Sequence, residues 1–470
     1  MRQRLAIALP GSCRDLAALG LALLAAACSE VPSSPATRTA LPAAAAVAEQ
    51  PTRRHLVALR GAERADLEAR VKSLGGRIER RHQSTGLVEV EGLDDQAAAA
   101  LAARADVERV VRDVTVQWIR PFTRVEQRRL DTPGPRAQGT DQHGAFFFPL
   151  QWNIRVTRAD QAWAVSRGGA GRLICILDTG VDPDHIDLAG RVDPQHLVSV
   201  ISSPVFPGDL DPLDYNAHGT LTAGFITTNG IGVASVAPDA RLCSVKVLNV
   251  LGSGTFGDVI AGIEYAAETA RADVINMSLG AYVNRQDPGI PLLVELVQRA
   301  VDVATRHGAL VVAAAGNDAI NLDDDPASFL AVPAQLRGVV SVAATGPIDQ
   351  RDFDRLASYS NFGGRTGVDL AAPGGDFVTG NLADLVIGPC SQYQLVLPFA
   401  CTPVDFVLAA GTSESAPHVA AAAAVVEAEL GGQRPPGTLE SCLESRADKV
   451  GPLRQLGAGR LNVLRAAQCR

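Results

Sequence analysis

Short hydrophobic and amphipathic elements follow one another in the first patterned part of the chain. Residues 55–61 form an apolar run, 62–76 have the spacing of an amphipathic helix that ends at glycines, and 77–92 alternate like one or two strands. Residues 93–106 favour a second helix and 107–118 a final strand. This βαββαβ order predicts a small ferredoxin-like α+β domain.

Longer and more continuous apolar runs begin near residue 149. Runs of valine, isoleucine and alanine alternate there with helical segments; they lie at 172–180, 242–250, 273–280, 309–317, 339–346 and 368–374. Apolar strands separated by helices are typical of a parallel sheet covered on both faces. The pattern therefore predicts a three-layer α/β domain, whose functional residues gather at the carboxyl ends of the strands.

Segments with little periodicity separate these parts and divide the chain into five. They are an N-terminal segment, 1–28; a linker rich in proline, alanine and serine, 29–51; the small domain, 52–120; an arginine-rich connection, 121–148; and the α/β domain, 149–470. We expect the second connection to be flexible and open to proteolysis.

The N-terminal segment predicts export. Arg2, Arg4 and Arg14 precede the apolar run "LAALGLALLAAA", which is too short for a comfortable membrane span and stops at Cys28. The ending "LLAAAC" resembles a bacterial lipobox, but "AAA" also satisfies an ordinary signal peptidase. A lipoprotein attached to the outer membrane or cell surface through Cys28, and a freely secreted protein, both stay open.

Composition narrows the function classes. Charged residues make up 20% of the chain, hydrophobic residues 47%, and the net charge is only −8, so nothing indicates a nucleic-acid partner. Aromatic residues make up 4%, and 44 glycines fit a compact α/β protein with many tight turns. We expect a monomer.

The cysteines fit an oxidising compartment. Cys13 and Cys28 belong to the export signal, which leaves six of the eight cysteines. Proximity in the chain favours the disulfides Cys390–Cys401 and Cys442–Cys469. The other two, Cys175 and Cys243, fall inside apolar strands, where we expect buried thiols.

Three polar residues stand out in segments of small side chains. Asp178 follows an apolar strand directly, where a partly buried carboxylate needs a hydrogen-bond partner. His218 precedes Gly219 where a helix is expected to start. Ser413 lies between Gly411 and an alanine-rich helix, whose N-terminal N–H groups can stabilise an anion. The order Asp, His, Ser matches one known arrangement of the nucleophilic triad.

The motifs around these residues, "ILDTGVD", "HGTLTAG" and "GTSESAPHVA", together with "AAAGN", resemble those of the subtilisin family of serine proteases. The resemblance covers most of 149–470 and implies that Ser413, rather than Ser415, is the nucleophile. It implies that His218 is the base, that Asp178 orients it, and that Asn317 binds the oxyanion.

The resemblance further implies that an extended peptide pairs with strands on two sides of a cleft. The expected substrate-binding residues are Gly252, Ser253, Gly254, Ser278, Leu279, Gly280, Ala313, Ala314, Ala315 and Gly316. Because these residues are uncharged, they favour an apolar side chain in the first specificity pocket. The small domain resembles the family's propeptide, which inhibits the active site until it is cleaved off. Its last strand would then lead toward that site.

Several points depart from the family pattern or stay open. Leu221 replaces a usual histidine, and Glu414 and Ser415 replace "MA" after the nucleophile. A glutamate beside His218 would favour the imidazolium, unless it points to solvent or pairs with an arginine. No cofactor is expected for the chemistry, but structural calcium is possible at acidic clusters, which comprise Asp209, Asp211, Asp214 and Asp323 to Asp325.

The interpretation is an exported endopeptidase that acts on proteins or peptides and is made as a zymogen. The alternative from another class is a catalytically silent binding protein of the same family, with Glu414 as the damaging change. An α/β-hydrolase esterase is disfavoured, since it requires G-x-S-x-G and the order Ser, Asp, His.

Overall fold

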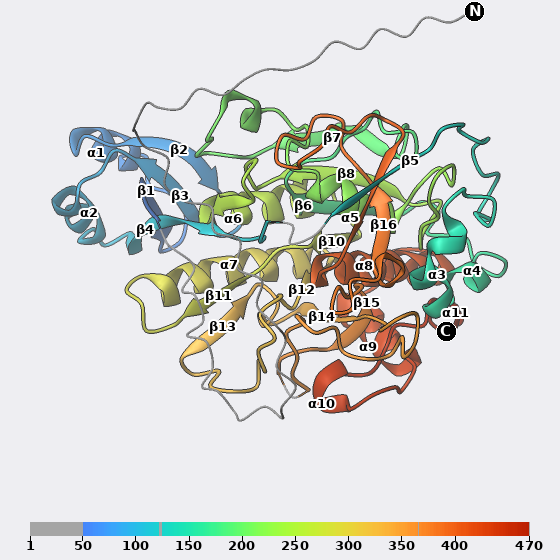
Figure 1. Ribbon diagram of the computed structural model, residues 1–470. Helices are drawn as coiled ribbons and strands as arrows, with labels where there is room; N and C mark the ends of the chain where they lie inside the picture. The colour runs from blue at the N-terminus through green and yellow to red at the C-terminus, as the bar shows by residue number, and fades with distance from the viewer. Residues whose placement is uncertain (1–49, 122–124, 365, 470) are drawn as a thin grey trace, which may run out of the picture. The chain divides into compact units, whose positions relative to one another are not determined.

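The small domain has the predicted order of elements. The structure, a computed structural model (Figure 1), describes residues 50–121, 125–364 and 366–469, so the export segment and nearly all of the linker 29–51 lie outside the described residues. The elements are β1 (Gln50–Leu59), α1 (Leu67–Ser73), β2 (Arg77–His82), β3 (Leu87–Glu91), α2 (Asp95–Ala102) and β4 (Val107–Gln117). The strands pair antiparallel in the order β2-β3-β1-β4, which is the ferredoxin-like arrangement.

A seven-stranded parallel sheet forms the centre of the large domain and confirms the predicted α/β fold. Its order is β15-β14-β12-β10-β6-β8-β7. The strands are β6 (Leu173–Asp178), β7 (Val192–Ser199), β8 (Arg241–Lys246), β10 (Val274–Met277), β12 (Leu310–Ala314), β14 (Val339–Thr345) and β15 (Leu370–Pro373). Strands β10, β12, β14 and β15 are buried at every position, which explains their unbroken apolar sequences.

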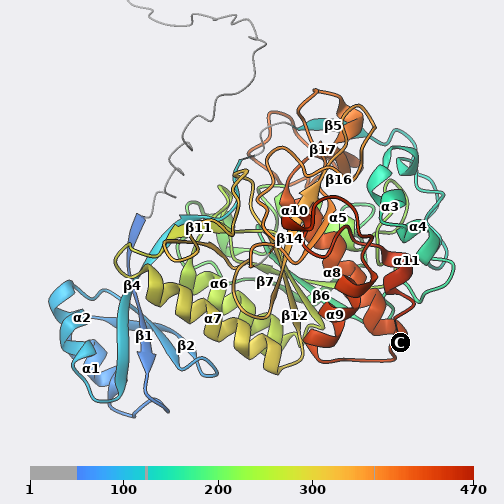
Figure 2. The same ribbon diagram turned by 90° about the horizontal axis from the view of Figure 1, so that it is seen from below.

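Helices cover both faces of this sheet, as Figure 2 shows. They are α5 (His218–Ile226), α6 (Phe256–Glu264), α7 (Ile290–Arg306), α8 (Thr412–Glu429) and α9 (Pro436–Arg446). Alternate strand residues face the two layers: Leu177 packs in the same core as α6 and α7, whereas Ile176 packs in the core that contains α8 and α9. The sheet edge at the carboxyl ends of β6 and β12 is thereby held between two packed layers.

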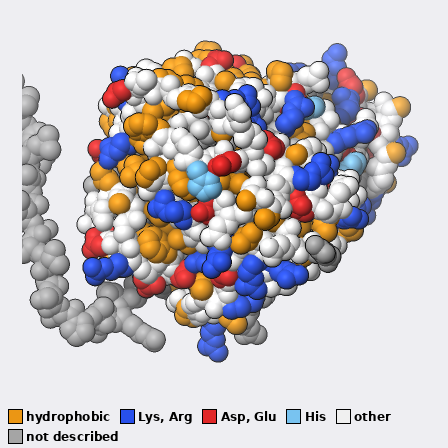
Figure 3. Space-filling view, turned by 90° about the vertical axis from the view of Figure 1, so that its right-hand side faces the viewer, with side chains coloured by type: hydrophobic (Ala, Val, Ile, Leu, Met, Phe, Trp, Pro, Cys, Tyr) orange, Lys and Arg blue, Asp and Glu red, His pale blue; other side chains and the backbone are white. Residues whose placement is uncertain are grey.

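Shorter elements complete the described chain. They are β5 (Glu126–Arg129), α3 (Trp152–Val156), α4 (Ala159–Ala162), β9 (Ser253–Thr255), β11 (Ala281–Asn284), β13 (Phe329–Val332), β16 (Val386–Pro389), β17 (Asp405–Ala409), α10 (Leu453–Leu456), α11 (Val463–Ala466) and the single turns η1 (Phe148–Leu150), η2 (Pro207–Leu210), η3 (Tyr265–Thr269) and η4 (Leu382–Asp384). In the described ranges no helix combines the length and the apolar character needed to span a bilayer. Basic and acidic side chains are interspersed over the face drawn in Figure 3.

The small domain contacts α6 through buried charged groups. The carboxylate of Asp113 faces the first turn of α6, where the N–H of Gly257 donates to it at 3.3 Å. His82 lies between two carboxylates, with Nδ1 2.5 Å from Glu264 of α6 and Nε2 2.8 Å from Glu89 of β3. All three acids and the histidine are buried, so charges from both domains meet away from water.

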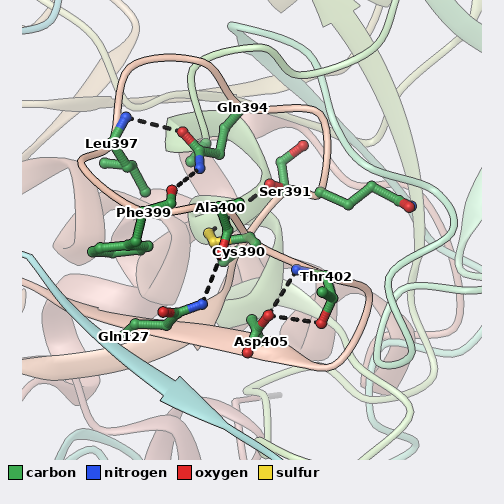
Figure 4. The surroundings of a disulfide bond; sticks show 12 residues. Gln127, Cys390, Ser391, Gln394, Leu397, Phe399, Ala400, Thr402 and Asp405 are labelled. Atoms are coloured by element: carbon green, nitrogen blue, oxygen red, sulfur yellow. Dashed lines mark hydrogen bonds between the residues drawn. A yellow bond between two sulfur atoms is a disulfide. The ribbon is translucent and has the colours of Figure 1, made fainter.

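Strand β5 is an addition that the sequence pattern did not indicate. It lies within the expected flexible connection 121–148, yet it pairs antiparallel with β17 as the third strand of a small sheet. Nε and Nη2 of Arg129 lie 2.8 and 2.9 Å from the two carboxylate oxygens of Asp405. Gln127 donates to the carbonyl of Ala400 at 2.9 Å, inside the loop closed by Cys390 and Cys401 (Figure 4). Residues from β5 onward therefore pack on the large domain.

Three disulfides join the described cysteines. Cys390–Cys401 and Cys442–Cys469 are the predicted pairs. The expectation of thiols at Cys175 and Cys243 is wrong, because these residues are bonded to each other. They occupy opposite positions in the paired strands β6 and β8, a register that the sequence alone does not reveal.

Candidate active site

Asp178 and His218 are joined at the carboxyl end of β6. Asp178 is the last residue of β6, and its Oδ1 lies 2.7 Å from Nδ1 of His218, the first residue of α5. Both side chains are buried. A buried carboxylate on Nδ1 fixes the ring and stabilises its protonated form. The sequence prediction of a hydrogen-bonded partner for Asp178 is met by this contact.

Asp214 holds the two segments that carry this pair. Its fully buried carboxylate accepts the hydroxyl of Thr179, which follows Asp178, at 2.8 Å. It also accepts the N–H of Ala217 at 2.9 Å and both the N–H and the hydroxyl of Thr220, at 2.8 and 2.6 Å. Ala217 has the left-handed φ of 86°, a conformation that costs a non-glycine residue about 1 kcal/mol or more. Asp214 thus stabilises the strained entry to α5.

Ser413 lies in the first turn of α8, as predicted. Its hydroxyl donates to the carbonyl of Ser278 at 3.0 Å, and the side chain of Ser278 donates back to the Ser413 carbonyl at 2.7 Å. Ser413 and His218 line one cavity. Ser415 is buried, and its hydroxyl donates to the carbonyl of Ala372 at 3.0 Å, so it takes no place in that cavity.

Asn317 follows β12 and lines the same cavity. Its Oδ1 accepts the N–H of Thr412 at 2.9 Å and the hydroxyl of Thr412 at 2.8 Å. Because the backbone N–H of Thr412 requires an oxygen acceptor, the amide orientation is fixed and Nδ2 is the group left to donate. The N-terminus of α8 therefore orients Asn317 as well as presenting Ser413.

Glu414 is buried beside the cavity that His218 and Ser413 line. Its side chain is 2% exposed and lines the cavity with His218, which rules out the solvent-facing alternative. Burial raises the pKa of Glu414 to about 7, against the opposing pull of the His218 charge. Burial lowers the pKa of His218, but Asp178 and then Glu414 outweigh it and raise that pKa above its ordinary value.

The last strand of the small domain crosses the cleft between the two expected strips. Strand β4 pairs antiparallel with β9, and beyond it the N–H of Trp118 donates to the carbonyl of Gly252 at 3.1 Å. On the other side the N–H of Gly280 donates to the carbonyl of Trp118 at 2.9 Å. Both strips thus bind extended backbone of the small domain, and their pairing with a substrate stays a prediction.

The expected residues differ in what they face. Of the ten expected residues, Leu279, Gly280, Ala314 and Gly316 line a cavity beside Ser413. Ala313 and Ala315 are buried in the hydrophobic core beneath it. The same cavity is also lined by Asp318, whose carboxylate pairs with Arg120. Sequence reasoning missed Asp318, although it directly follows the predicted oxyanion residue.

The acidic residues considered for calcium have other partners. Asp209 accepts the N–H groups of Val205 and Val250 at 2.9 and 2.8 Å, and Asp211 accepts the hydroxyl of Tyr215 at 2.9 Å. Among the described residues, the one acidic group whose ligand atoms lie within 4.8 Å of one another is Asp369, Glu440 and Glu444. The acidic residues Asp209, Asp211, Asp214 and Asp323 to Asp325 do not form such a group, and structural calcium at them stays a prediction.

Comparisons with known proteins agree with this geometry. Residues 169–459 match the subtilase family. Thermitase from Thermoactinomyces vulgaris is 33% identical over 327 residues, a match that covers 69% of this chain and 98% of thermitase. A thermophilic serine proteinase from Bacillus sp. (strain AK1) is 34% identical over 308 residues, which are 65% of this chain but only 63% of that protein.

A solved structure shares the fold. The epidermin leader peptide processing serine protease from Staphylococcus aureus superposes with a TM-score of 0.71, is 21% identical, and the match covers 88% of this chain and 97% of that one. The family match and the named relatives show a serine-type endopeptidase. The chain belongs to the subtilase family.

The first prediction concerns Asp214. In Asp214→Ala, backbone and hydroxyl donors lose a buried acceptor, which we expect to destabilise the protein by about 3 kcal/mol or more. Displacement of His218 lowers kcat roughly 100-fold. Thermal unfolding and peptide hydrolysis measure both effects, with Asp211→Ala, an acid of the same loop, as the control. Equal effects of the two variants would contradict a positioning role for Asp214.

The second prediction concerns Glu414. Since the ionised glutamate raises the pKa of His218, Glu414→Gln should move the acidic limb of kcat/KM to lower pH. The measurement is a pH profile at low salt, which limits screening. The matched control is Glu427→Gln, which removes a buried glutamate of the same helix about 20 Å away. An acidic limb at the same pH in Glu414→Gln as in the wild type would contradict the coupling between Glu414 and His218.

Proposed function

We propose that the protein is an exported serine endopeptidase, made as a zymogen, in which Asp178, His218 and Ser413 are the catalytic residues. The observation that carries the proposal is the hydrogen bond of 2.7 Å between buried Asp178 and His218, with Ser413 on the same cavity at a helix N-terminus. The names of related proteins, thermitase and a thermophilic serine proteinase, support the same activity.

Each group has a step in peptide hydrolysis. For attack on the substrate carbonyl, the Ser413 hydroxyl leaves the Ser278 carbonyl and passes its proton to His218. Asn317 Nδ2 and the N–H of Ser413 in the first turn of α8 stabilise the oxyanion, and loss of such a side-chain donor typically costs ~100 to 1000-fold in rate. His218 then protonates the leaving amine, and water repeats the sequence on the acyl-enzyme.

Autoinhibition follows from the same contacts. A substrate needs the backbone groups of Gly252 and Gly280, and β4 with Trp118 already uses them. We infer that the small domain is an inhibitory propeptide and that the enzyme cuts the chain before β5, because β5 is paired within the large domain. Three disulfides favour an oxidising compartment and so support export.

Substitution of the nucleophile tests the activity. We expect Ser413→Ala to abolish peptide hydrolysis and labelling by a fluorophosphonate, and to accumulate as uncut precursor. Ser415→Ala, which removes a buried hydroxyl outside the cavity, should retain labelling and measurable turnover. If the wild-type protein, after removal of the small domain, is neither labelled nor active, it is a silent binding protein. Normally sized mature Ser413→Ala protein would show that another protease makes the cut.

The contact between propeptide and α6 should weaken as pH rises. Burial lowers the pKa of His82, but the carboxylates of Glu264 and Glu89 overcome this and raise it from 6.5 to about 9. The stabilisation of the folded state by protonated His82 is therefore fully present below pH 6.5 and is lost as pH rises through about 9. The difference in the free energy of unfolding is on the order of 3 kcal/mol. Burial also raises the pKa of Asp113, to about 7, which acts in the same direction.

Calorimetry of the uncut Ser413→Ala precursor checks this sign. The unfolding temperature of the small domain should fall between pH 6.5 and 9, and the fall should shrink in a variant that also carries His82→Gln. His143→Gln, which removes an exposed histidine of the large domain, is the control. An equal fall in all three proteins would contradict a role of His82.

A further inference from the structure

Lys246, the last residue of β8, is completely buried under the loop 205–216, which leads into α5. Its side chain is 0% exposed, and lysine is almost never found in that state without partners. The chain contains only two other lysines, Lys72 and Lys449, and both are exposed. An ammonium group in this position therefore needs contacts that offset the loss of its hydration.

Backbone carbonyls from two points of the loop bind the ammonium. Nζ of Lys246 donates to the carbonyl of Gly208 at 3.3 Å and to the carbonyl of Leu213 at 2.8 Å. It also lies over the ring of Tyr215, 4.8 Å from the ring centroid, where a cation is attracted to the π-face. One side chain thus joins two parts of the loop that are five residues apart.

Acids of the same loop provide the matching negative charge. Asp209 Oδ1 lies 4.0 Å from Nζ of Lys246, and both Asp209 and Asp214 are completely buried. Burial lowers the pKa of Lys246, whereas Asp214, Asp209 and then Asp211 act in the opposite direction. The ammonium therefore offsets buried carboxylate charges, which would otherwise be held away from water without a counter-charge.

Lys246 also connects the segments that carry the Asp–His pair. It lies opposite Asp178 in the pairing of β6 with β8, and the N–H groups of the next two residues donate to the Asp178 carbonyl at 2.9 and 3.1 Å. Leu213, which accepts from the ammonium, directly precedes Asp214, the acid that holds the first turn of α5. The main chain of Lys246 thus supports Asp178, and its side chain supports the approach to His218.

The side of the loop that faces the substrate strip has separate attachments. Asp209 accepts the N–H of Val250 at 2.8 Å, and Asn216 donates to the Val250 carbonyl at 2.7 Å. Val250 lies just before Gly252, where the strip begins. These two bonds do not involve the ammonium, so loss of Lys246 should disturb the inner side of the loop more than the strip.

We propose that Lys246 is a positioning residue of the peptidase, and that its buried ammonium fixes the loop 205–216 and so the place of His218 relative to Asp178. This inference rests on the proposed peptidase function. A neutral side chain of equal length could fill the same space. It would leave the carbonyls of Gly208 and Leu213 without their donor and the buried acids without their counter-charge.

The variant Lys246→Met tests the role, because methionine keeps the length and apolar stem of the side chain without its charge or donors. Peptide hydrolysis is expressed per site labelled by a fluorophosphonate, so that unfolded protein does not count. We expect kcat to fall roughly 10- to 100-fold and KM to change by no more than roughly threefold.

The matched control is Lys449→Met. Lys449 is an exposed lysine that likewise donates to two carbonyls, those of Glu444 and Ala458, at 3.0 and 2.8 Å. It lies outside the loop 205–216, and its replacement should leave kcat at the wild-type value. A fall in kcat that is specific to Lys246→Met therefore reports on the loop and not on the loss of any lysine that binds carbonyls.

The pH profile separates positioning by charge from a purely structural role. Asp214 contributes to the raised pKa of His218, and without the ammonium its negative charge has lost a buried counter-charge. The acidic limb of kcat/KM should therefore move to higher pH in Lys246→Met, opposite to the shift expected for Glu414→Gln. Loss of packing alone would lower the rate without moving the limb.

Neutralising Asp209 in both backgrounds completes the test. In the wild type, Asp209→Asn should lower kcat, since the ammonium loses a neighbouring carboxylate. In Lys246→Met the same change removes an uncompensated charge, so it should raise kcat by roughly threefold and return the acidic limb toward its wild-type pH. Opposite signs in the two backgrounds are the result expected of a charge pair.

The outcomes distinguish this inference from the proposed function. A wild-type kcat in Lys246→Met, an unmoved acidic limb, or an equal effect of Asp209→Asn in both backgrounds overturns the role of Lys246. Failure of both Lys246→Met and its double variant with Asp209→Asn to give labelled enzyme also overturns it, because the double variant leaves no unpaired ammonium or Asp209 charge. A wild-type enzyme that is neither labelled nor active instead overturns the peptidase function.

Discussion

The carboxylate of Asp214 accepts hydrogen bonds from the segment after β6 and from the first turn of α5 at once. Those two segments carry Asp178 and His218, which belong to different layers of the fold. Without a shared acceptor, the left-handed Ala217 would leave α5 free to relax away from the sheet. Parallel strands bring the proposed catalytic groups to one edge, and Asp214 fixes the backbone of the segment that carries His218.

Two further carboxylates face the imidazole from different sides. Asp178 contacts Nδ1 directly, and Glu414 lines the same cavity as the ring. Both favour the charged histidine, although only Asp178 also fixes its orientation. A buried, ionised glutamate therefore favours the charged form of His218, whereas a neutral residue would not. The raised pKa of Glu414 reflects the free-energy cost of keeping its charge away from water.

The parts that were predictable from the sequence are those specified locally. Apolar runs marked the buried strands, and the chemistry of a strand end or helix start singled out Asp178, His218 and Ser413. Features that depend on pairing were not predictable. Cys175 and Cys243 meet only because β6 and β8 align in one register, and Asp318 meets a charge from another domain. The carboxylate of Asp214 is of a type that can bind a cation, but the fold brings hydrogen-bond donors such as Thr179 to it instead.

Strand β5 escaped prediction because an edge strand with one neighbour needs no apolar alternation; its backbone does the pairing. Its position has a consequence for the enzyme after activation. A cut before β5 creates a new chain end. Unpaired chain ends are preferred sites of proteolysis, including cleavage by other copies of the same enzyme. Here the residues that follow the cut pair with β17, and Gln127 donates to a carbonyl of the Cys390–Cys401 loop. Their backbone is therefore not available to pair with the active site of another molecule. In a chain cut as we propose, this pairing would keep the new chain end out of the active site of another copy.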